Sequence, residues 1–245
     1  MKIQLSNLKK RFGDKTAVDI PDFTVNDGDI IGLVGNNGAG KTTLFRLMLD
    51  LLKVDEGRVV MCPDKDGITV DVPDEIDPSQ SEDWKLFTGA YIDNSFLIDF
   101  LTAEEYFEFI GKVSGMTKEQ TTERLGDFEH FMNGEVLGQK KYIRDFSAGN
   151  KQKVGIIAAL MNRPQLVILD EPFNFLDPSS QHQLKQLITA FNKETGATVL
   201  ISSHNLQHTV EISTRVALLE HGVIIKDLDN TQGNAEKKLE EYFNV

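Results

Sequence analysis

The sequence predicts an α/β protein with a mostly parallel sheet flanked by helices on both faces. Short apolar runs, bounded by glycine or acidic residues, alternate along the chain with longer segments that carry apolar residues at helical spacing. One run leads through a glycine-rich loop at residues 35–42 into a helical pattern, and a later run ends in Asp170-Glu171. Strands that alternate with helices in this way build a parallel sheet.

Composition is that of an ordinary globular protein, and it argues against some partners. The chain has 245 residues, of which 40% are hydrophobic and 26% charged, enough for one large domain or for a core and a subdomain. The net charge of −12 argues against nucleic acid as a partner, because a phosphate backbone is bound by a dense basic face. Cys62 is the only cysteine, so an intrachain disulfide is impossible and a reducing compartment is expected. Because neither a signal-peptide core nor a span of about 18 apolar residues occurs, the sequence predicts a cytoplasmic protein.

The N-terminal part of the chain is predicted to form an antiparallel β region. Ile3, Leu5 and Leu8 predict an edge strand that runs to Phe12, and Gly13-Asp14 is typical of a turn. The patterns that follow predict a strand at 18–25, a strand at 29–34, a helix at 43–52 and a strand at 58–61. Residues 63–83 are acidic and rich in Pro, Ser and Asp, which favours a solvated loop with a short strand at 67–72, and 84–92 returns to strand character.

The middle of the chain changes to helical character. Thr102 with Glu105, and Thr117 with Gln120, form capping boxes, which predict helices at 103–113 and from 118 toward 132. A further helix is expected at 151–161. Residues 93–160 are therefore predicted to be an α-helical subdomain inserted into a core formed by residues 1–92 and 161–245.

The last third returns to alternating strands and helices. The run 165–169 predicts a buried strand. Asp177 followed by Pro178 predicts the start of a helix, because aspartate caps a helix and proline fits its first turn. The remaining expected elements are a strand at 197–202, a hairpin of 216–220 with 223–226, and a charged terminal helix at 235–243.

The segment from Gly35 to Thr42 fits the pattern G-x-x-x-x-G-K-[ST] of a phosphate-binding loop. Between a strand and a helix start, such a loop directs backbone N–H groups and the positive end of the helix dipole at one anion. Lys41 is suited to neutralise the β- and γ-phosphates, and the Thr42 hydroxyl is suited to Mg²⁺. The alternative is a glycine-rich turn before an amphipathic helix, and the flanking strand and helix favour a nucleotide. The expected ATP contacts here are Gly35, Asn36, Asn37, Gly38, Ala39, Gly40, Lys41, Thr42 and Thr43.

Three side chains elsewhere are candidates for the chemistry. Asp170 and Glu171 follow a buried strand, where Asp170 is suited to hold Mg²⁺ and Glu171 to act as general base for an attacking water. The alternative is a helix-capping acidic pair, and the preceding phosphate loop favours catalysis. His204 follows the strand 197–202 and can donate to a γ-phosphate oxygen, although a lone histidine is more often an ordinary surface or core residue. No Cys/His cluster has metal-ligand spacing, so no zinc or iron site is predicted.

In this order of motifs the chain resembles the ATP-binding subunits of ABC transporters. The resemblance implies a P-loop NTPase core with a helical subdomain. The resemblance covers nearly the whole chain. Residues 35–42 match the family's Walker A motif, 166–170 its Walker B motif, and His204 its switch histidine. Residues 146–150 and 174–177 lie where the family has its signature and its D-loop. Phe12, which taken alone favours a packed hairpin residue, matches the aromatic that stacks on adenine.

The resemblance implies a Mg²⁺-dependent ATPase that works as a head-to-tail dimer. Two ATP molecules would be buried between one subunit's phosphate loop and the signature of a second ATP-binding subunit, identical or not. The dimer would energise transport by a separately encoded integral membrane permease, through which the subunit would lie on the inner face of the cell membrane. The residues implied to contact ATP in trans are Ser147, Gly149, Asn150 and Asp177, and the implied metal ligands are Thr42, Asp170 and Asp93.

Three positions depart from the family's pattern. The signature has Ala148 in place of glycine and Asn150 in place of glutamine, so a weaker contact in trans is expected from Ser147 and Gly149. Asp93 stands where the family has its Q-loop glutamine; it can still bind Mg²⁺, but it is charged and shorter by one methylene, about 1.5 Å. The alternative is that the neighbouring Asn94 takes this role.

Two other functions remain open from the sequence. One is a soluble ABC-type ATPase outside transport, such as an iron–sulfur assembly component. The other is a weakly hydrolysing regulatory half of a heterodimeric transporter, which Asp93 and the altered signature favour, and which the intact Glu171 and His204 oppose.

Overall fold

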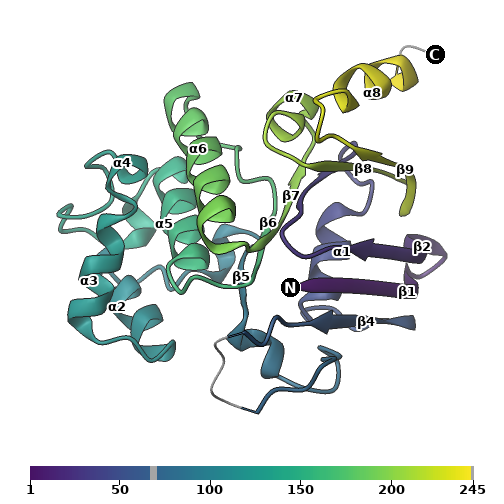
Figure 1. The fold of residues 1–245 in the computed structure, drawn as a ribbon. Helices are drawn as coiled ribbons and strands as arrows, with labels where there is room; N and C mark the ends of the chain where they lie inside the picture. The colour runs from purple at the N-terminus through teal and green to yellow at the C-terminus, as the bar shows by residue number, and fades with distance from the viewer. Residues whose placement is uncertain (67–70, 244–245) are drawn as a thin grey trace.

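An antiparallel sheet at the N-terminus forms one side of the molecule (Figure 1). The computed structural model of the chain describes residues 1–66 and 71–243. Strands β1 (Lys2–Phe12), β2 (Lys15–Val25) and β4 (Glu56–Cys62) pair in the order β2-β1-β4. The edge position predicted for the first strand is therefore wrong, because β4 pairs along its second side. The fully buried residues Ile3, Leu5 and Leu8 identify the buried side of a strand but not its paired edges.

The main sheet has six strands in the order β5-β6-β7-β3-β8-β9. All neighbours pair in parallel except β8 and β9, which confirms the predicted mostly parallel sheet. Strands β3, β6 and β7 are buried along their whole length, as expected where both faces of a parallel sheet are covered. The strands are β3 (Ile30–Val34), β5 (Thr88–Tyr91), β6 (Leu166–Leu169), β7 (Thr198–Ser203), β8 (Arg215–Glu220) and β9 (Val223–Asp229).

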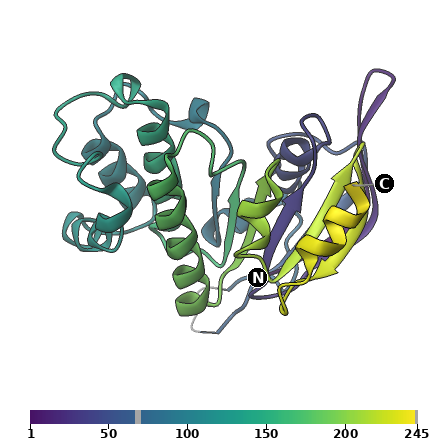
Figure 2. The same ribbon diagram turned by 90° about the horizontal axis from the view of Figure 1, so that it is seen from above.

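The helices lie in separate groups around this sheet. Helix α1 packs between the two sheets, where Phe45 is fully buried in a cluster with Leu5 and Leu200. Figure 2 shows α2 to α5 together on the side away from the N-terminal sheet, with α6 beside them. The helices are α1 (Lys41–Met48), α2 (Ala103–Val113), α3 (Lys118–Gly126), α4 (Glu129–Met132), α5 (Ala148–Leu160), α6 (Pro178–Thr195), α7 (Leu206–Val210) and α8 (Ala235–Phe243), with 3₁₀ turns η1 (Asp83–Leu86), η2 (Asn94–Phe96) and η3 (Ile143–Asp145).

The helical region and the main sheet share one hydrophobic core. The cluster that contains Phe107 of α2 and Val154 of α5 also contains Leu169 of β6. Both predicted capping boxes are present at the first residues of α2 and α3. The subdomain boundaries at residues 93 and 160 stay a prediction. Within the described residues, no helix is both long and apolar enough to cross a membrane.

Several predicted boundaries differ from the structure. Helix α1 ends at Met48, because Asp50 adopts a left-handed conformation with φ of 50°. The helix expected to reach 132 divides into α3 and α4 after Gly126, and Phe128 turns into the core with 1% of its surface exposed. The strand expected at 84–92 forms only as β5, because η1 occupies its first half. Helix α5 begins three residues earlier than expected. Helix α7 was not predicted. Most of the short strand expected at 67–72 lies outside the described residues.

Candidate active site

The loop between β3 and α1, residues 35–42, is tightly enclosed by neighbouring backbone. Gly38 and Gly40 have φ values of 82° and 111°, which favour glycine. A Cβ atom at Gly40 would lie 2.5 Å from the carbonyl oxygen of Ala17, and one at Gly35 would lie 2.3 Å from that of Leu219. The loop therefore follows a path that larger residues at these positions would block.

Lys41 begins α1 and directs its charge back into this phosphate loop. Its side chain is 5% exposed, and Nζ donates to the carbonyl oxygen of Gly35 at 2.7 Å. The same Nζ lies 3.2 Å from Oε1 of Glu171. The ammonium group thus links the loop to the acidic residue at the end of β6, and a bound phosphate group would compete with Glu171 for it.

Asp170 is held by two hydroxyl groups, one from the first turn of α1 and one from the end of the neighbouring strand β7. Thr42 Oγ1 donates to Asp170 Oδ2 at 2.5 Å, and Ser202 Oγ donates to Oδ1. Burial raises the pKa of the Asp170 carboxyl, the two hydroxyl donors oppose that rise, and the nearby charge of Glu171 adds to it. Sequence reasoning missed Ser202; the available signal was a pair of serines at the end of an otherwise apolar strand.

Glu171 stands at the centre of the site in an unusual backbone conformation. Its φ is 47°, a value uncommon for a residue with a side chain. Its Oε2 lies 2.9 Å from Nδ1 of His204, a residue whose side chain is half exposed. Its amide N–H donates to Ser202 Oγ at 2.8 Å, and its carbonyl oxygen accepts from Nε2 of Gln152 at 3.1 Å. The structure thus brings Lys41, Glu171 and His204 together.

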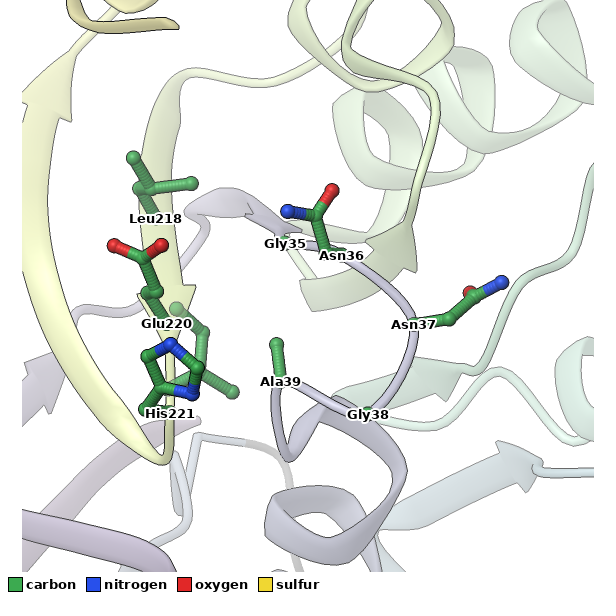
Figure 3. Close-up of a pocket in the computed structure, with 9 residues that line it drawn as sticks. Gly35, Asn36, Asn37, Gly38, Ala39, Leu218, Glu220 and His221 are labelled. Carbon is green, nitrogen blue, oxygen red and sulfur yellow. The ribbon is translucent and has the colours of Figure 1, made fainter.

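Two hollows border the phosphate loop. One is lined by Phe12, Lys15, Ala17, residues 37–43 and Glu171. The other, shown in Figure 3, lies between residues 35–39 and the end of β8 with the turn at His221, and Ala39 points into it. Only the first contains the charged and hydroxyl side chains described above. It is therefore the better candidate for a nucleoside triphosphate.

Phe12 presents an aromatic face at the rim of the first hollow. It ends β1, and 52% of its surface is exposed. Lys10 Nζ lies 5.6 Å from its ring centroid. A ring that is half exposed beside a phosphate site can stack on a planar base.

Asp93 has both carboxylate oxygens engaged away from the phosphate loop. Oδ1 accepts from the amide of Ser95 at 2.7 Å, which caps η2, and Oδ2 accepts from Arg46 of α1 at 3.1 Å. Burial favours a higher pKa for Asp93, but the hydrogen bonds from Ser95 and Arg46 outweigh it and lower the pKa. A metal ligand at this position would have to leave an ion pair, which sequence reasoning did not anticipate.

The residues expected to act in trans lie at the first turns of α5 and α6. Ser147 caps α5 and accepts from the amide of Asn150 at 3.2 Å. Ser147 is exposed, and a Cβ at Gly149 would lie 2.6 Å from the carbonyl oxygen of Phe175. Asp177 caps α6 and accepts from the amides of Ser179 and Ser180, so its carboxylate already has a structural use.

The chemistry of the oxygen donors fits Mg²⁺. The Thr42 hydroxyl and the Asp170 carboxylate adjoin the phosphate loop, and Mg²⁺ prefers such oxygen ligands together with phosphate and water. Within residues 1–66 and 71–243, no group of three His, Cys, Asp or Glu side chains is arranged to hold a metal alone. This pattern suits a metal that is bound jointly with a nucleotide.

Comparisons with known proteins agree with this arrangement. The family model described as ABC transporter matches residues 18–174. The uncharacterized ABC transporter ATP-binding protein YhcH of Bacillus subtilis is 30% identical over 246 residues, which cover 98% of this chain and 74% of that protein. The bacitracin transport ATP-binding protein BcrA of Enterococcus faecalis is 29% identical, over 99% of this chain and 74% of that protein. A solved dimer of the ATP-binding cassette MJ0796 bound to ADP and Pi has the same fold, with a TM-score of 0.77 and 22% identity over 93% of this chain and 98% of that chain.

These matches include the phosphate loop, the strand that ends in Asp170 and the region that carries Ser147. The family model alone spans more than half of the chain, and the relatives span nearly all of it. The chain therefore belongs to the ATP-binding subunits of ABC transporters, the ATPases that energise transport together with membrane partners.

Proposed function

We propose that this chain hydrolyses Mg²⁺-bound ATP with Glu171 as general base. The observation that carries the proposal is the position of the Glu171 carboxylate, with Lys41 on one oxygen and His204 on the other. A carboxylate at the mouth of a phosphate loop is placed to accept a proton from a water that attacks the γ-phosphate. A positioned general base contributes about 100- to 10,000-fold, or roughly 3–5 kcal/mol of barrier.

The other side chains bind and orient the nucleotide. The backbone of residues 35–43 and Lys41 hold the phosphates, while Phe12 stacks on the adenine. Thr42 and Asp170 hold Mg²⁺, which neutralises charge on the phosphates. His204 donates to a γ-phosphate oxygen and keeps the attacking water beside Glu171.

The proposed active form is a head-to-tail dimer with a second ATP-binding subunit. Ser147 and Ala148 are exposed, so the start of α5 offers a hydroxyl group and helix N–H groups to the γ-phosphate bound by the partner. Gly149 and Asn150 lie in the same turn. Asp177 is proposed to contact the partner from the first turn of α6 while it caps that helix. The solved MJ0796 cassette is described as a dimer, which supports this assembly.

We further propose that a helical segment of a membrane permease docks in an apolar groove between the core and the helical region. The groove is lined by residues from the turn that follows α1, from β5 and η2, and from α2 and α5. Leu51, Phe96 and Val113 line it and are 48%, 52% and 71% exposed, so three separate elements present apolar surface. The names of the relatives, as transporter ATP-binding proteins, support a permease as the occupant.

A second candidate is a weakly hydrolysing half of a heterodimer. The ion pair between Asp93 and Arg46 favours it, because a ligand engaged elsewhere leaves the metal with fewer protein contacts. Turnover of the purified chain, measured alone and mixed with an ATPase encoded nearby, separates the two candidates. A chain that turns over only in the mixture is the regulatory half.

The test of the main proposal is the Glu171→Gln variant with ATP. We expect hydrolysis to fall at least 100-fold and an ATP-dependent dimer to accumulate, measured by light scattering after size exclusion. Glu220→Gln, which alters the hollow on the other side of the loop, is the matched control and should hydrolyse ATP normally. Undiminished hydrolysis by Glu171→Gln would refute the mechanism.

The permease is tested by recovery of tagged Glu171→Gln protein from detergent-solubilised membranes. A polytopic membrane protein should be recovered with it, and Val113→Glu should abolish that recovery while leaving the ATP-dependent dimer intact. Val223→Glu, an exposed valine on β9, is the control and should change neither result. Recovery of soluble partners alone would instead favour an ABC-type ATPase outside transport.

A further inference from the structure

Two buried polar side chains form a line of contacts that ends at the main chain of Glu171. Gln152 of α5 and Tyr91 of β5 are 2% and 5% exposed. Gln152 Nε2 donates to the carbonyl oxygen of Glu171 at 3.1 Å, and Gln152 Oε1 lies 3.3 Å from the hydroxyl of Tyr91. The Tyr91 hydroxyl also lies 3.0 Å from Oδ1 of Asn94. A continuous line of hydrogen bonds thus runs from η2 to the main chain of the general base.

The direction of each hydrogen bond follows from the groups available. A carbonyl oxygen only accepts, so the amide nitrogen of Gln152 must face Glu171 and its oxygen must face Tyr91. A tyrosine hydroxyl carries its proton at neutral pH, so Tyr91 can donate it to Gln152 or to Asn94. One proton cannot serve both acceptors at once, so the contact with Gln152 responds to the orientation of the Asn94 amide.

The packing around Tyr91 indicates that this contact is built into the fold. A Cβ atom at Gly155 of α5 would lie 2.3 Å from Cδ2 of the Tyr91 ring, so the ring lies directly on the helix at a position without a side chain. The carbonyl oxygen of Tyr91 accepts from the amide of Asp170 at 2.8 Å. Tyr91 is therefore fixed against both α5 and the end of β6.

Glu171 needs such support because its backbone conformation is unfavourable. Non-glycine residues in the left-handed region cost about 1 kcal/mol or more and persist where the surroundings hold them. Ser202 holds the amide of Glu171 and Gln152 holds its carbonyl group. The two contacts together set the direction of the side chain.

We propose that Gln152 is a positioning residue for Glu171 and that Tyr91 links it to Asn94 at the edge of the apolar groove. The inference rests on the proposed role of Glu171 as general base. In this arrangement, α5, which Ser147 caps, and η2, which borders the groove, both control the geometry of the base. A partner that moves either element changes the rate of hydrolysis without touching ATP.

The test compares Gln152→Leu and Tyr91→Phe in steady-state ATP hydrolysis by the full chain. Gln152→Leu should lower kcat at least 10-fold while KM for ATP changes less than twofold, and Tyr91→Phe should lower kcat two- to fivefold. The double variant should match Gln152→Leu alone, because both act through one line of contacts. Gln183→Leu is the matched control: Gln183 lies on α6, and its Oε1 is buried without a partner among the described residues.

The outcomes separate this inference from the proposed function. If Glu171→Gln abolishes hydrolysis but Gln152→Leu and Tyr91→Phe keep the wild-type kcat, the positioning role is wrong and the general base stands. If Glu171→Gln hydrolyses ATP normally, the general base itself is wrong. If Gln152→Leu does not fold, Tyr91→Phe decides, because it keeps the packed ring and removes only the hydroxyl. Effects of the two single variants that multiply in the double variant would overturn the link between them.

Discussion

Replacement of Ser202 by alanine should destabilise the protein more than loss of a typical buried hydroxyl. The Ser202 side chain donates to the Asp170 carboxylate and accepts from the amide of Glu171, and the residue is fully buried. Alanine removes both contacts, and water has no access to replace them. A hydrogen bond to a charged group contributes about 1.5–3 kcal/mol and a neutral one about 1 kcal/mol, so the expected loss is about 2–4 kcal/mol.

Urea unfolding followed by circular dichroism measures this loss. With a slope of about 3 kcal/mol per molar, suited to a chain of this size, the midpoint should fall by roughly 1 M. Ser213→Ala is the matched control. Its hydroxyl is also buried but donates to the carbonyl oxygen of Thr209, which keeps a backbone donor in the amide of Ser213. The control should lose less than about 1 kcal/mol, and equal midpoints for the two variants would refute the reasoning.

Three further predictions concern the phosphate loop, the stacking of adenine on Phe12 and the cap of α6. In thermal unfolding, Gly38→Ala should lower the free energy of unfolding by about 1 kcal/mol. Gly40→Ala should lower it by about 3 kcal/mol and abolish ATP binding, because its Cβ would meet the carbonyl oxygen of Ala17. Equal losses for the two variants would contradict the clash at Gly40. Phe12→Ala should weaken ATP binding about 5- to 30-fold by calorimetric titration and leave tripolyphosphate binding unchanged, because only the base stacks on the ring. Asp177→Ala should lose about 1 kcal/mol of stability at pH 7, and Asp177→Asn, which still caps α6, much less. Hydrogen bonds from Ser180 lower the pKa of Asp177 in the folded protein. The charged carboxylate therefore stabilises the fold above pH 3.8, the ordinary pKa of aspartate, and this stabilisation is lost as the pH falls through the lowered pKa. The free energies of unfolding of the wild type and of Asp177→Asn should therefore differ more at pH 7 than at pH 3.

Much of the fold could be predicted from the sequence because capping residues and apolar spacing agree with the tertiary structure. Helix α2 begins and ends at the predicted residues, since Thr102 and Glu105 satisfy the first amides of the helix wherever it packs. The central position of β1 in its sheet could not be predicted, because it depends on pairing with β4, a segment distant in sequence. Helix α7 has five residues, too few for a helical period to stand out.

The candidate site was predictable where side chains follow strands. The carboxyl ends of parallel strands meet at one edge of the sheet, so the phosphate loop, Glu171 and His204 were expected to converge. Ser202 and Gln152 were missed because their importance comes from contacts with Glu171 across strands and helices. Asp93 was assigned to the metal by its position in the chain, and only the fold places Arg46 beside it. The roles of these residues in catalysis stay predictions.

The place of β3 in the main sheet has a consequence for synthesis of the protein. The strand precedes the phosphate loop, yet Ile31 pairs with Leu200 of β7 on one side and with Arg215 of β8 on the other. Contacts between residues so distant in sequence form slowly, because a long stretch of chain must be closed first. A nascent chain therefore gains the sheet that supports its nucleotide site only after residue 215 has left the ribosome. Until β7 has been made, β3 is an apolar strand without either neighbour, and until β8 follows it lacks one of them, so the chain is exposed to aggregation in this interval.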